Sequence, residues 1–443
     1  MRCPYLYHVA MRHGIVTGPA APGKATGISR SFIIVGAGLA TIGIGSLGFL
    51  AIASRSLDEA MFAKFGVWFG LVNVASFGLF VPLETAIARL LLSGAEFAGR
   101  IRYETIRYAS AVLLAILVLV MAFQSVVMTR LMNDSWPLVA TSVAYLAALA
   151  LQAVQRGISV GRSQFWPLFW QFGTDGVLRL TLPILIVATG HASTGAFALS
   201  VVVSASTGLL SGQIALAVGG TNSQRRRSSV GMDSKSLSSL VVAALGAQLL
   251  ANGAPPVLSL IGRDTPAVLA GVVGALALTR IPLLFASAIQ APLLPPMVRL
   301  VRSGDAGGLW KLLKRLLAGF GALGLFAFAV GWYAGALVLR TYLGDDYGAR
   351  PISMALLTSA GVALLAVVAV QAAIVAVEAH AVLAASWGLG ITIFMVATAV
   401  PANGLILAPV SIATATAATL GAMLTGLKCA TDTHSRRSGS IAL

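Results

Sequence analysis

Four ionisable residues lie inside long apolar stretches of the sequence: Glu84, Asp175, Arg179 and Arg280. A charged side chain at the centre of a bilayer costs roughly 2.5–3.5 kcal/mol to insert, so such residues face a cavity or an oppositely charged partner. Carboxylate and guanidinium groups in these positions can bind a charged cargo, take up a coupling ion or pair with one another. The four residues are therefore the first candidates for a functional site.

Arg280 is the strongest candidate for contact with a cargo. It lies near the middle of its apolar stretch, and Pro282 follows it closely. Proline leaves a backbone carbonyl unpaired and can bend a helix toward an internal cavity. The planar guanidinium can donate two hydrogen bonds at once to a phosphate or pyrophosphate. The alternative is a structural ion pair between Arg280 and Glu84.

The other three charged residues have structural interpretations as well. Asp175 and Arg179 have the spacing of one helical turn, so they share a helix face and can neutralise one another. We favour this structural pair, with substrate binding or proton coupling as the alternative. Glu84 lies shortly before Arg89, whose long side chain can extend to lipid headgroups. Glu84 is interpreted as a gating or interface residue, and the alternative is a role in substrate or ion coupling.

Two polar residues complete the candidate site. Gln248 and Asn252 lie just before the double proline Pro255-Pro256. Proline removes a backbone donor and interrupts a helix. We therefore predict a broken helix whose polar end lines a cavity.

The composition indicates that these residues work in a membrane. The chain has 443 residues, of which 58% are hydrophobic and 10% are charged, whereas soluble domains carry about 25% charged residues. A spanning segment needs about 20 apolar residues, and it must be helical because lipid cannot satisfy free backbone groups. The sequence predicts an all-α polytopic membrane protein with twelve transmembrane helices. They are expected at about residues 29–53, 65–92, 106–128, 136–156, 166–190, 194–219, 237–261, 266–297, 315–340, 351–376, 380–401 and 403–427.

The connections between these stretches predict the orientation. Connections on the side of the two termini carry most of the Lys and Arg residues, among them Arg100, Arg156, Arg225 and Lys311. Excess basic charge marks cytoplasmic loops. We therefore place both termini in the cytoplasm, and we attribute the net charge of +16 to these loops rather than to nucleic-acid binding.

The chain repeats itself with an offset of 210 residues. The offset aligns Pro82 with Pro292, Arg89 with Arg299, and Ser93-Gly94 with Ser303-Gly304. Most of the other apolar stretches also fall on a counterpart at this offset. Each half holds an even number of helices, so the halves are parallel repeats related by an axis along the membrane normal. None of the four charged residues has a charged counterpart in the other half, which favours function over a requirement of the fold.

This repeat divides the chain into two lobes. The expected parts are a disordered cytoplasmic tail at 1–28, an N-terminal six-helix lobe at 29–219, a basic cytoplasmic linker at 220–236, a C-terminal six-helix lobe at 237–427 and a cytoplasmic tail at 428–443. Two parallel lobes flank a central cavity and rock about it. The arrangement predicts a transporter that works by alternating access.

Two parallel six-helix halves occur in major facilitator transporters and in the multidrug/oligosaccharidyl-lipid/polysaccharide (MOP) flippase superfamily. The loop from Ser93 to Arg100 lacks the Asp-Arg core that major facilitators usually carry there. The turn at 54–65 resembles the acidic turn before the second helix of polysaccharide-biosynthesis flippases, and 78–89 resembles the end of that helix. The chain therefore resembles the polysaccharide or O-antigen flippase-like branch of the superfamily, although many members of that branch have more helices.

The resemblance implies a MATE-like fold and a function. Such a flippase moves a lipid-linked oligosaccharide, typically a polyprenyl-pyrophosphate glycan, across the bacterial plasma (inner) membrane for cell-surface polysaccharide synthesis. Its partners are the glycan substrate, membrane lipids, and a glycan polymerase or glycosyltransferases. The main alternative is a MATE-type multidrug or small-molecule exporter. A membrane glycosyltransferase that uses a polyprenyl-phosphate sugar is a weaker alternative, suggested by the external acidic pair Asp58-Glu59.

The sequence does not indicate other chemistry. The external connections are short, so we do not expect an enzyme. The five histidines and two cysteines are scattered without ligand spacing, which predicts neither a metal site nor a disulfide framework. The run from Gly18 to Lys24 approaches a phosphate-binding loop, but Ala25 replaces the Ser or Thr that would hold magnesium. We therefore expect no nucleotide cofactor.

Overall fold

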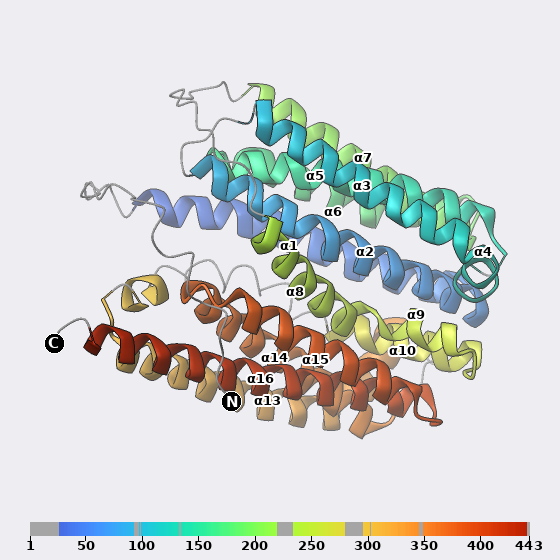
Figure 1. The fold of residues 1–443 in the computed structure, drawn as a ribbon. Coiled ribbons are helices and arrows are strands. Elements are labelled where there is room, and N and C mark those ends of the chain that lie inside the picture. Colours follow the sequence, from blue (N-terminus) through green and yellow to red (C-terminus); the bar gives the residue numbers. More distant parts are fainter. Residues whose placement is uncertain are drawn as a thin grey trace.

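The computed structural model describes residues 26–92, 97, 99–132, 134–218, 234–279, 296–301, 303–344 and 349–440, and the regular structure in these ranges is helical (Figure 1). The first half contains α1 (Thr26–Ser56), α2 (Glu59–Leu92), α3 (Gly99–Ala122), α4 (Gln124–Val126), the π-helix η1 (Val127–Leu131), α5 (Trp136–Gly161), α6 (Trp166–Ala188) and α7 (Thr194–Val218). The second half contains α8 (Ser234–Asn252), α9 (Ala254–Ile261), α10 (Pro266–Thr279), α13 (Ala306–Leu343), α14 (Pro351–Ala376), α15 (His380–Ala399) and α16 (Gly404–Ser440). We refer to these two groups as the N-lobe and the C-lobe.

The described helices lie at the twelve predicted positions. Ten are long and apolar enough to cross a membrane, and α8 and α9, which meet at a bend of 74°, make an eleventh when they are counted as one broken span. The remaining position holds α10, which ends where residues 280–295 fall outside the described part of the chain. The predicted tail at 1–28 and linker at 220–236 lie almost wholly outside the described residues. The C-terminal tail predicted from residue 428 is instead helical as far as Ser440, because α16 continues without a break.

Local sequence signals account for several helix boundaries. Prolines occupy the first turn of α5, α6, α9 and α14, where a missing backbone donor costs no helical hydrogen bond. Asp305 caps α13 by accepting a hydrogen bond from the backbone nitrogen of Gly308 at 2.7 Å. Gly262 ends α9 with a φ of 70°, a left-handed conformation that glycine adopts without strain. These signals fix where each helix enters the bundle.

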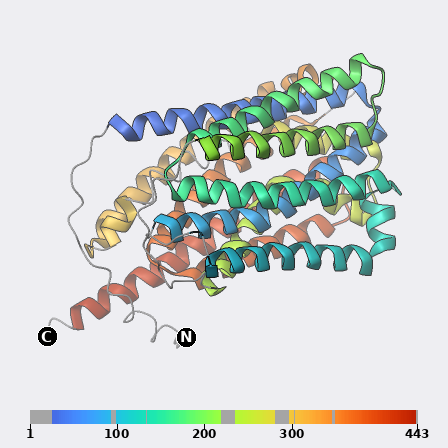
Figure 2. The same ribbon diagram turned by 90° about the horizontal axis from the view of Figure 1, so that it is seen from above.

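The first half of the chain forms one group of helices and the second half forms another (Figure 1). Within the N-lobe, α1 packs on α6, α6 on α7, and α2 on α5; within the C-lobe, α13 packs on α14 and α15 on α16. The start of α1 and the end of α16 lie at the same end of the bundle, which we call the termini end (Figure 1, Figure 2). The opposite end, where α1 and α13 finish, is the distal end.

The two lobes meet along α2, and three glycines make the approach close. A Cβ atom at Gly66 would lie 2.2 Å from Val273 Cγ2, and one at Gly78 would lie 2.5 Å from Leu245 Cδ2. A Cβ at Gly70 would lie 2.7 Å from the carbonyl oxygen of Asn252. Small residues allow helices in a membrane to pack backbone to backbone. The contact between the lobes is therefore tight on this side.

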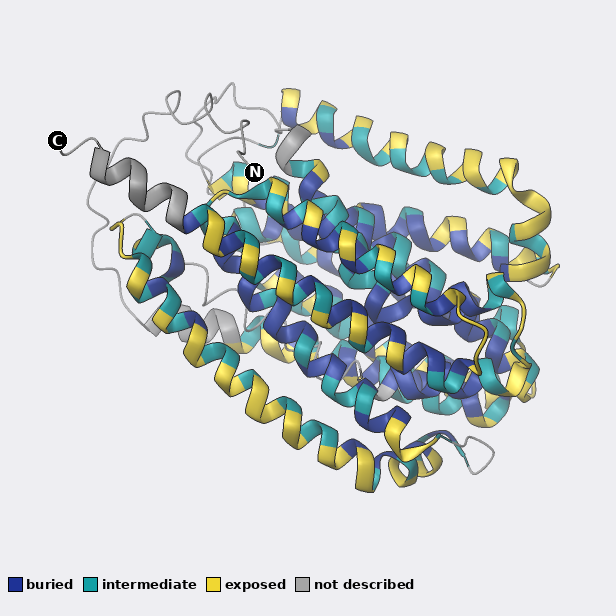
Figure 3. Ribbon diagram, turned by 60° about the horizontal axis from the view of Figure 1, so that its bottom comes forward, coloured by how far each residue is buried: buried dark blue, intermediate teal, exposed yellow. Residues whose placement is uncertain are grey.

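Helices at the rim of the bundle carry long runs of exposed residues (Figure 3). Only 6% of the apolar window of α3 and 17% of that of α13 are buried in the protein. Phe326 and Leu325 on α13 and Leu114 and Met121 on α3 are among the exposed side chains. Since water would penalise this much exposed apolar surface, these faces fit a hydrocarbon environment.

Candidate functional site

The interior of the N-lobe holds a buried ion pair at mid-helix. Asp175 Oδ1 accepts a hydrogen bond from Arg179 Nε at 2.8 Å, and both residues belong to α6. Arg179 Nη2 also donates to the hydroxyl of Tyr145 on α5 at 3.1 Å. The side chain of Asp175 is 2% exposed and that of Arg179 is 6% exposed. The pairing that their spacing predicted is therefore present and is completed by a tyrosine.

A second ion pair lies nearer the termini end and joins α2 to α5. Arg156 Nε donates to Glu84 Oε2 at 2.7 Å, and Arg156 Nη1 donates to Gln152 Oε1 at 3.0 Å. Gln152 in turn donates from Nε2 to the carbonyl oxygen of Ala205 on α7 at 2.7 Å. The Arg156 guanidinium also lies over the ring of Phe172, 5.9 Å from its centroid. Three helices of the N-lobe thus share one polar network.

The partner of Glu84 corrects the sequence interpretation. Arg280 was the predicted alternative partner, and Arg156 was assigned to a basic connection between helices. Arg156 instead lies within α5, which continues to Gly161, and it is 5% exposed. Among the described residues, Glu84 is therefore tied within its own lobe, and its predicted alternative partner Arg280 lies outside the described part of the chain. The spacing of Tyr145, Gln152 and Arg156 on one face of α5 was the signal that could have revealed this position.

Two buried glutamines lie between the ion pairs, and sequence reasoning missed both. Gln155 on α5 and Gln171 on α6 are fully buried, and their side-chain oxygen and nitrogen atoms have no partner within the described part of the chain. Both adjoin Gly212 of α7, where a Cβ atom would lie 1.9 Å from Gln155 Nε2 and 3.1 Å from Gln171 Cβ. A buried polar group without a partner costs about 1–3 kcal/mol. The N-lobe therefore encloses hydrogen-bonding capacity that its described residues do not use.

Gln248 and Asn252 lie at the break between α8 and α9. Asn252 Nδ2 donates to Gln248 Oε1 at 2.8 Å, and the bend of 74° confirms the predicted interruption before the double proline. Because the carbonyl of Asn252 lies against Gly70 of α2, this polar turn is at the seam between the lobes. Arg280 lies outside the described residues.

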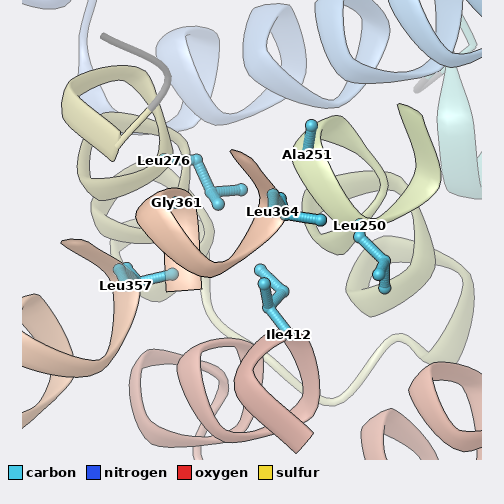
Figure 4. Close-up of a pocket in the computed structure, with 7 residues that line it drawn as sticks. All are labelled: Leu250, Ala251, Leu276, Leu357, Gly361, Leu364 and Ile412. Carbon is cyan, nitrogen blue, oxygen red and sulfur yellow. The ribbon is translucent and has the colours of Figure 1, made fainter. Parts of the chain in front are cut away.

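The C-lobe interior has a different character. A cavity of about 10 Å³ between α8, α10, α14 and α16 has room for little more than one water molecule. Its lining is apolar and consists of Leu250, Ala251, Leu276, Leu357, Gly361, Leu364 and Ile412 (Figure 4). The buried charges of the described chain are therefore concentrated in the N-lobe.

Hydrogen bonds join the lobes at the distal end. Ser54 Oγ donates to the carbonyl oxygen of Leu343 at 3.1 Å, and Arg55 Nη2 donates to that of Thr341 at 2.6 Å. The last carbonyls of a helix have no partner within it, so these donors satisfy the end of α13. The hydroxyl of Tyr342 also donates to the carbonyl of Leu47 on α1. We call these contacts the α1–α13 latch.

A second contact between the lobes, also at the distal end, corresponds to the first through the sequence repeat. Ser259 on α9 donates to the carbonyl oxygen of Arg130 in η1. A Cβ at Gly262 would lie 1.8 Å from Arg130 Nη1, so the guanidinium lies close to the end of α9. Adding the sequence offset of 210 to Arg130 gives Arg340 in the last turn of α13. The two contacts therefore involve matching parts of the two halves.

The chain is similar in sequence to mycobacterial proteins. It matches no family model. It is 26% identical over 422 residues to the uncharacterized protein Rv3630 of Mycobacterium tuberculosis (strain H37Rv), covering 92% of this chain and 93% of that protein. The uncharacterized protein Mb3654 of Mycobacterium bovis matches with the same identity and coverage.

Solved structures match over most of the chain. A MATE protein in the bent conformation has a TM-score of 0.60 at 16% identity, covering 94% of this chain and 96% of that one. An inward-facing multidrug resistance MATE family transporter of the MOP superfamily has a TM-score of 0.60 at 14% identity, with coverage of 93% and 100%. The lipid II flippase MurJ, in an inward closed conformation, has a TM-score of 0.62 at 13% identity, with coverage of 89% and 87%. The chain therefore has a MATE-like fold, as its sequence predicted.

Proposed function

From this MATE-like fold of the MOP superfamily, we propose that the chain is a membrane transporter that moves an anionic, lipid-linked oligosaccharide between the leaflets of a bacterial plasma membrane. The main support is the balance of charge: the apolar stretches hold Arg156, Arg179 and Arg280 but only two acids, Glu84 and Asp175, each of which pairs with an arginine. A guanidinium donates in a fork that matches phosphate oxygens and stays charged in a low-dielectric site. Arg280 supplies a third positive charge within an apolar stretch that carries no acidic residue.

The orientation of the protein in the membrane follows from the basic residues at the termini end. Exposed basic residues at the termini end include Arg100, Arg102, Arg107, Lys311 and Lys314, and basic connections face the cytoplasm. The distal end, which the α1–α13 latch and the Ser259–Arg130 contact hold together, then faces outward. Opening of these contacts exposes the site to the outer leaflet, and their closure returns it to the inner one. Both termini are cytoplasmic in this arrangement.

The substrate class follows from the contrast between the lobes. A pyrophosphate-linked glycan carries negative charge and suits guanidinium groups, while its polyprenyl chain suits the apolar faces of the lobes. The structural neighbours include multidrug MATE transporters and the lipid II flippase MurJ. The carboxylates of Asp175 and Glu84 favour a second candidate, an exporter of small cations. Each of these carboxylates already binds a guanidinium, however, so a cationic cargo would have to displace an arginine to reach it.

Transport by purified protein in proteoliposomes tests the proposal. One arm follows transfer of a fluorescent polyprenyl-pyrophosphate disaccharide between leaflets by loss of signal to a membrane-impermeant quencher. A second arm follows efflux of a cationic dye from the same vesicles. We expect accelerated transfer of the lipid-linked sugar over protein-free vesicles and no dye efflux. Dye efflux without lipid transfer would replace the flippase proposal with the exporter. That result would also remove the reason to propose glycan polymerases or glycosyltransferases as partners, because these enzymes act with a flippase.

A further inference from the structure

The two acidic residues inside the apolar stretches of the sequence are both occupied. Glu84 and Asp175 are the acids that those stretches contain, and each binds an arginine of the same lobe in the structure. A transporter driven by a cation gradient needs a membrane-embedded group that binds and releases the cation in each cycle. Carboxylates are the usual groups for this purpose. The groups that bind these two carboxylates therefore determine whether a driving cation can bind to them.

The geometry around Asp175 leaves little of its carboxylate unused. Oδ1 lies 2.8 Å from Arg179 Nε, and Oδ2 lies 3.5 Å from Arg179 Nη2. The arginine is covalently attached one turn away on the same helix. Unlike a free cation, it therefore occupies this position whatever the salt concentration of the buffer. Its Nη2 is also held by the hydroxyl of Tyr145 at 3.1 Å. The pair is buried, where the attraction between opposite charges is little screened.

Further polar side chains lie in the same part of the N-lobe. The amides of Gln171, one turn before Asp175, and Gln155 have no partner within the described residues. Gly208 of α7 lies against this part of α6: a Cβ there would lie 3.0 Å from Asp175 Cβ and 2.8 Å from the backbone carbonyl oxygen of Gln171. A carboxylate, a phenol oxygen and amide oxygens form a set that suits a hard monovalent cation. The guanidinium of Arg179 lies where such a cation would neutralise Asp175.

The helices packed against α6 contribute few other charges. On α5, the titratable residues that face this region are Tyr145 and Arg156, both of which are bonded as described. α7 has no titratable residue. α1, which meets α6 where Gly45 lies against Gly176, has none between Ile33 and Ser54. Arg179 is therefore the cation in direct contact with Asp175.

We propose that Arg179 is a built-in counter-cation that fills a monovalent-cation site centred on Asp175, so that transport proceeds without a Na⁺ ion or a proton bound in the N-lobe. The statement about transport rests on the proposed function, whereas the statement about the site does not. Replacing the guanidinium by a neutral group of similar reach should turn the region into a site for a free cation.

Thermal unfolding of the purified full chain in detergent tests the site. The variants are Arg179→Gln, which frees the carboxylate, and the double variant Asp175→Asn/Arg179→Gln, which removes both charges. Each is measured in NaCl and in choline chloride at equal ionic strength, at pH 6 and pH 8. We expect the Tm of the wild type to be the same in all four buffers, and we expect the same constancy for the double variant. We expect Na⁺ or the lower pH to raise the Tm of Arg179→Gln by about 2–4 °C, as for a bound stabilising ligand.

Each other outcome of this measurement contradicts the proposal. A wild-type Tm that rises with Na⁺ would show that the carboxylate region already binds a free cation. An Arg179→Gln variant that is insensitive to both cations, or that fails to fold in all four buffers, would show that no cation can replace the guanidinium. Folding that occurs only with Na⁺ or at pH 6 would support the proposal.

Transport of the lipid-linked disaccharide supplies a separate test of the coupling. In proteoliposomes with wild-type protein, we expect the rate to change less than twofold when the Na⁺ and pH gradients are both removed. A loss of transfer without the gradients would overturn the coupling inference while leaving the flippase proposal intact. If no condition gives transfer, the proposed function fails, and the thermal measurement still decides whether Arg179 fills the site.

Discussion

Removal of either charge from the Asp175–Arg179 pair should destabilise the protein far more than removal of both. The two side chains are 2% and 6% exposed, so a single substitution leaves the other charge buried without its counter-ion. Breaking a buried pair in this way costs about 3–5 kcal/mol, whereas replacing both partners by apolar residues is often neutral or stabilising. We therefore expect Asp175→Leu and Arg179→Leu each to lower the free energy of unfolding by about 3–5 kcal/mol. The double variant should lie within about 1 kcal/mol of the wild type.

The chain contains a matched control for this comparison. Arg100 and Glu104 on α3 have the same helical spacing and an Nε–Oε1 distance of 2.7 Å, but the arginine is 69% exposed. Solvent screens such a pair, and it contributes about 0.3–0.5 kcal/mol. Equilibrium unfolding of the purified protein in mixed micelles of a non-ionic detergent and Tris dodecyl sulfate, in sodium-free buffer, gives the four free energies of each cycle. Additive losses in the Asp175–Arg179 cycle would refute the conclusion that these charges compensate one another.

Three further substitutions test the packing and the contacts between lobes. Gly45→Ala should lower the free energy of unfolding by about 1–3 kcal/mol, because its Cβ would lie 2.1 Å from the carbonyl oxygen of Gly176. Denaturant unfolding measures this loss. A variant as stable as the wild type would contradict the close contact between α1 and α6. Gly36→Ala is the control, since a Cβ there meets nothing within 4 Å. Arg55→Ala should loosen the α1–α13 latch, seen by electron paramagnetic resonance as more long distances between spin labels at Glu59 and Arg350. An unchanged distance distribution would show that the latch does not hold the distal end.

The positions of the helices could be predicted because the bilayer imposes a simple rule on the sequence. Apolar runs of sufficient length must be helical in lipid, and the described helices lie at all twelve predicted positions. The Asp175–Arg179 pair was equally predictable, because helical geometry alone brings residues at this spacing together. The break after Asn252 followed from the two prolines that cannot donate backbone hydrogen bonds.

Other parts of the site could not be predicted, because they depend on which helices are neighbours and the sequence alone does not show this. Arg156 was assigned to a connection because its charge marked the end of an apolar run, whereas the bonds to Glu84 and Gln152 allow α5 to keep it buried. Gln155 and Gln171 are neutral and gave no signal on their own. The α1–α13 latch uses backbone carbonyls as acceptors, and every residue has one, so no residue type marked those positions.

The most direct test of the anionic-cargo account is the rate of leaflet transfer of a labelled polyprenyl-pyrophosphate disaccharide by the variant Arg280→Ala. The matched control is Arg89→Ala, which removes an exposed arginine at the termini end of α2. Both proteins are reconstituted at equal density after their folding has been checked by thermal unfolding. If Arg280 binds the anionic cargo, Arg280→Ala abolishes transfer while Arg89→Ala transfers the lipid at the wild-type rate. Undiminished transfer by a folded Arg280→Ala protein would contradict the anionic-cargo account.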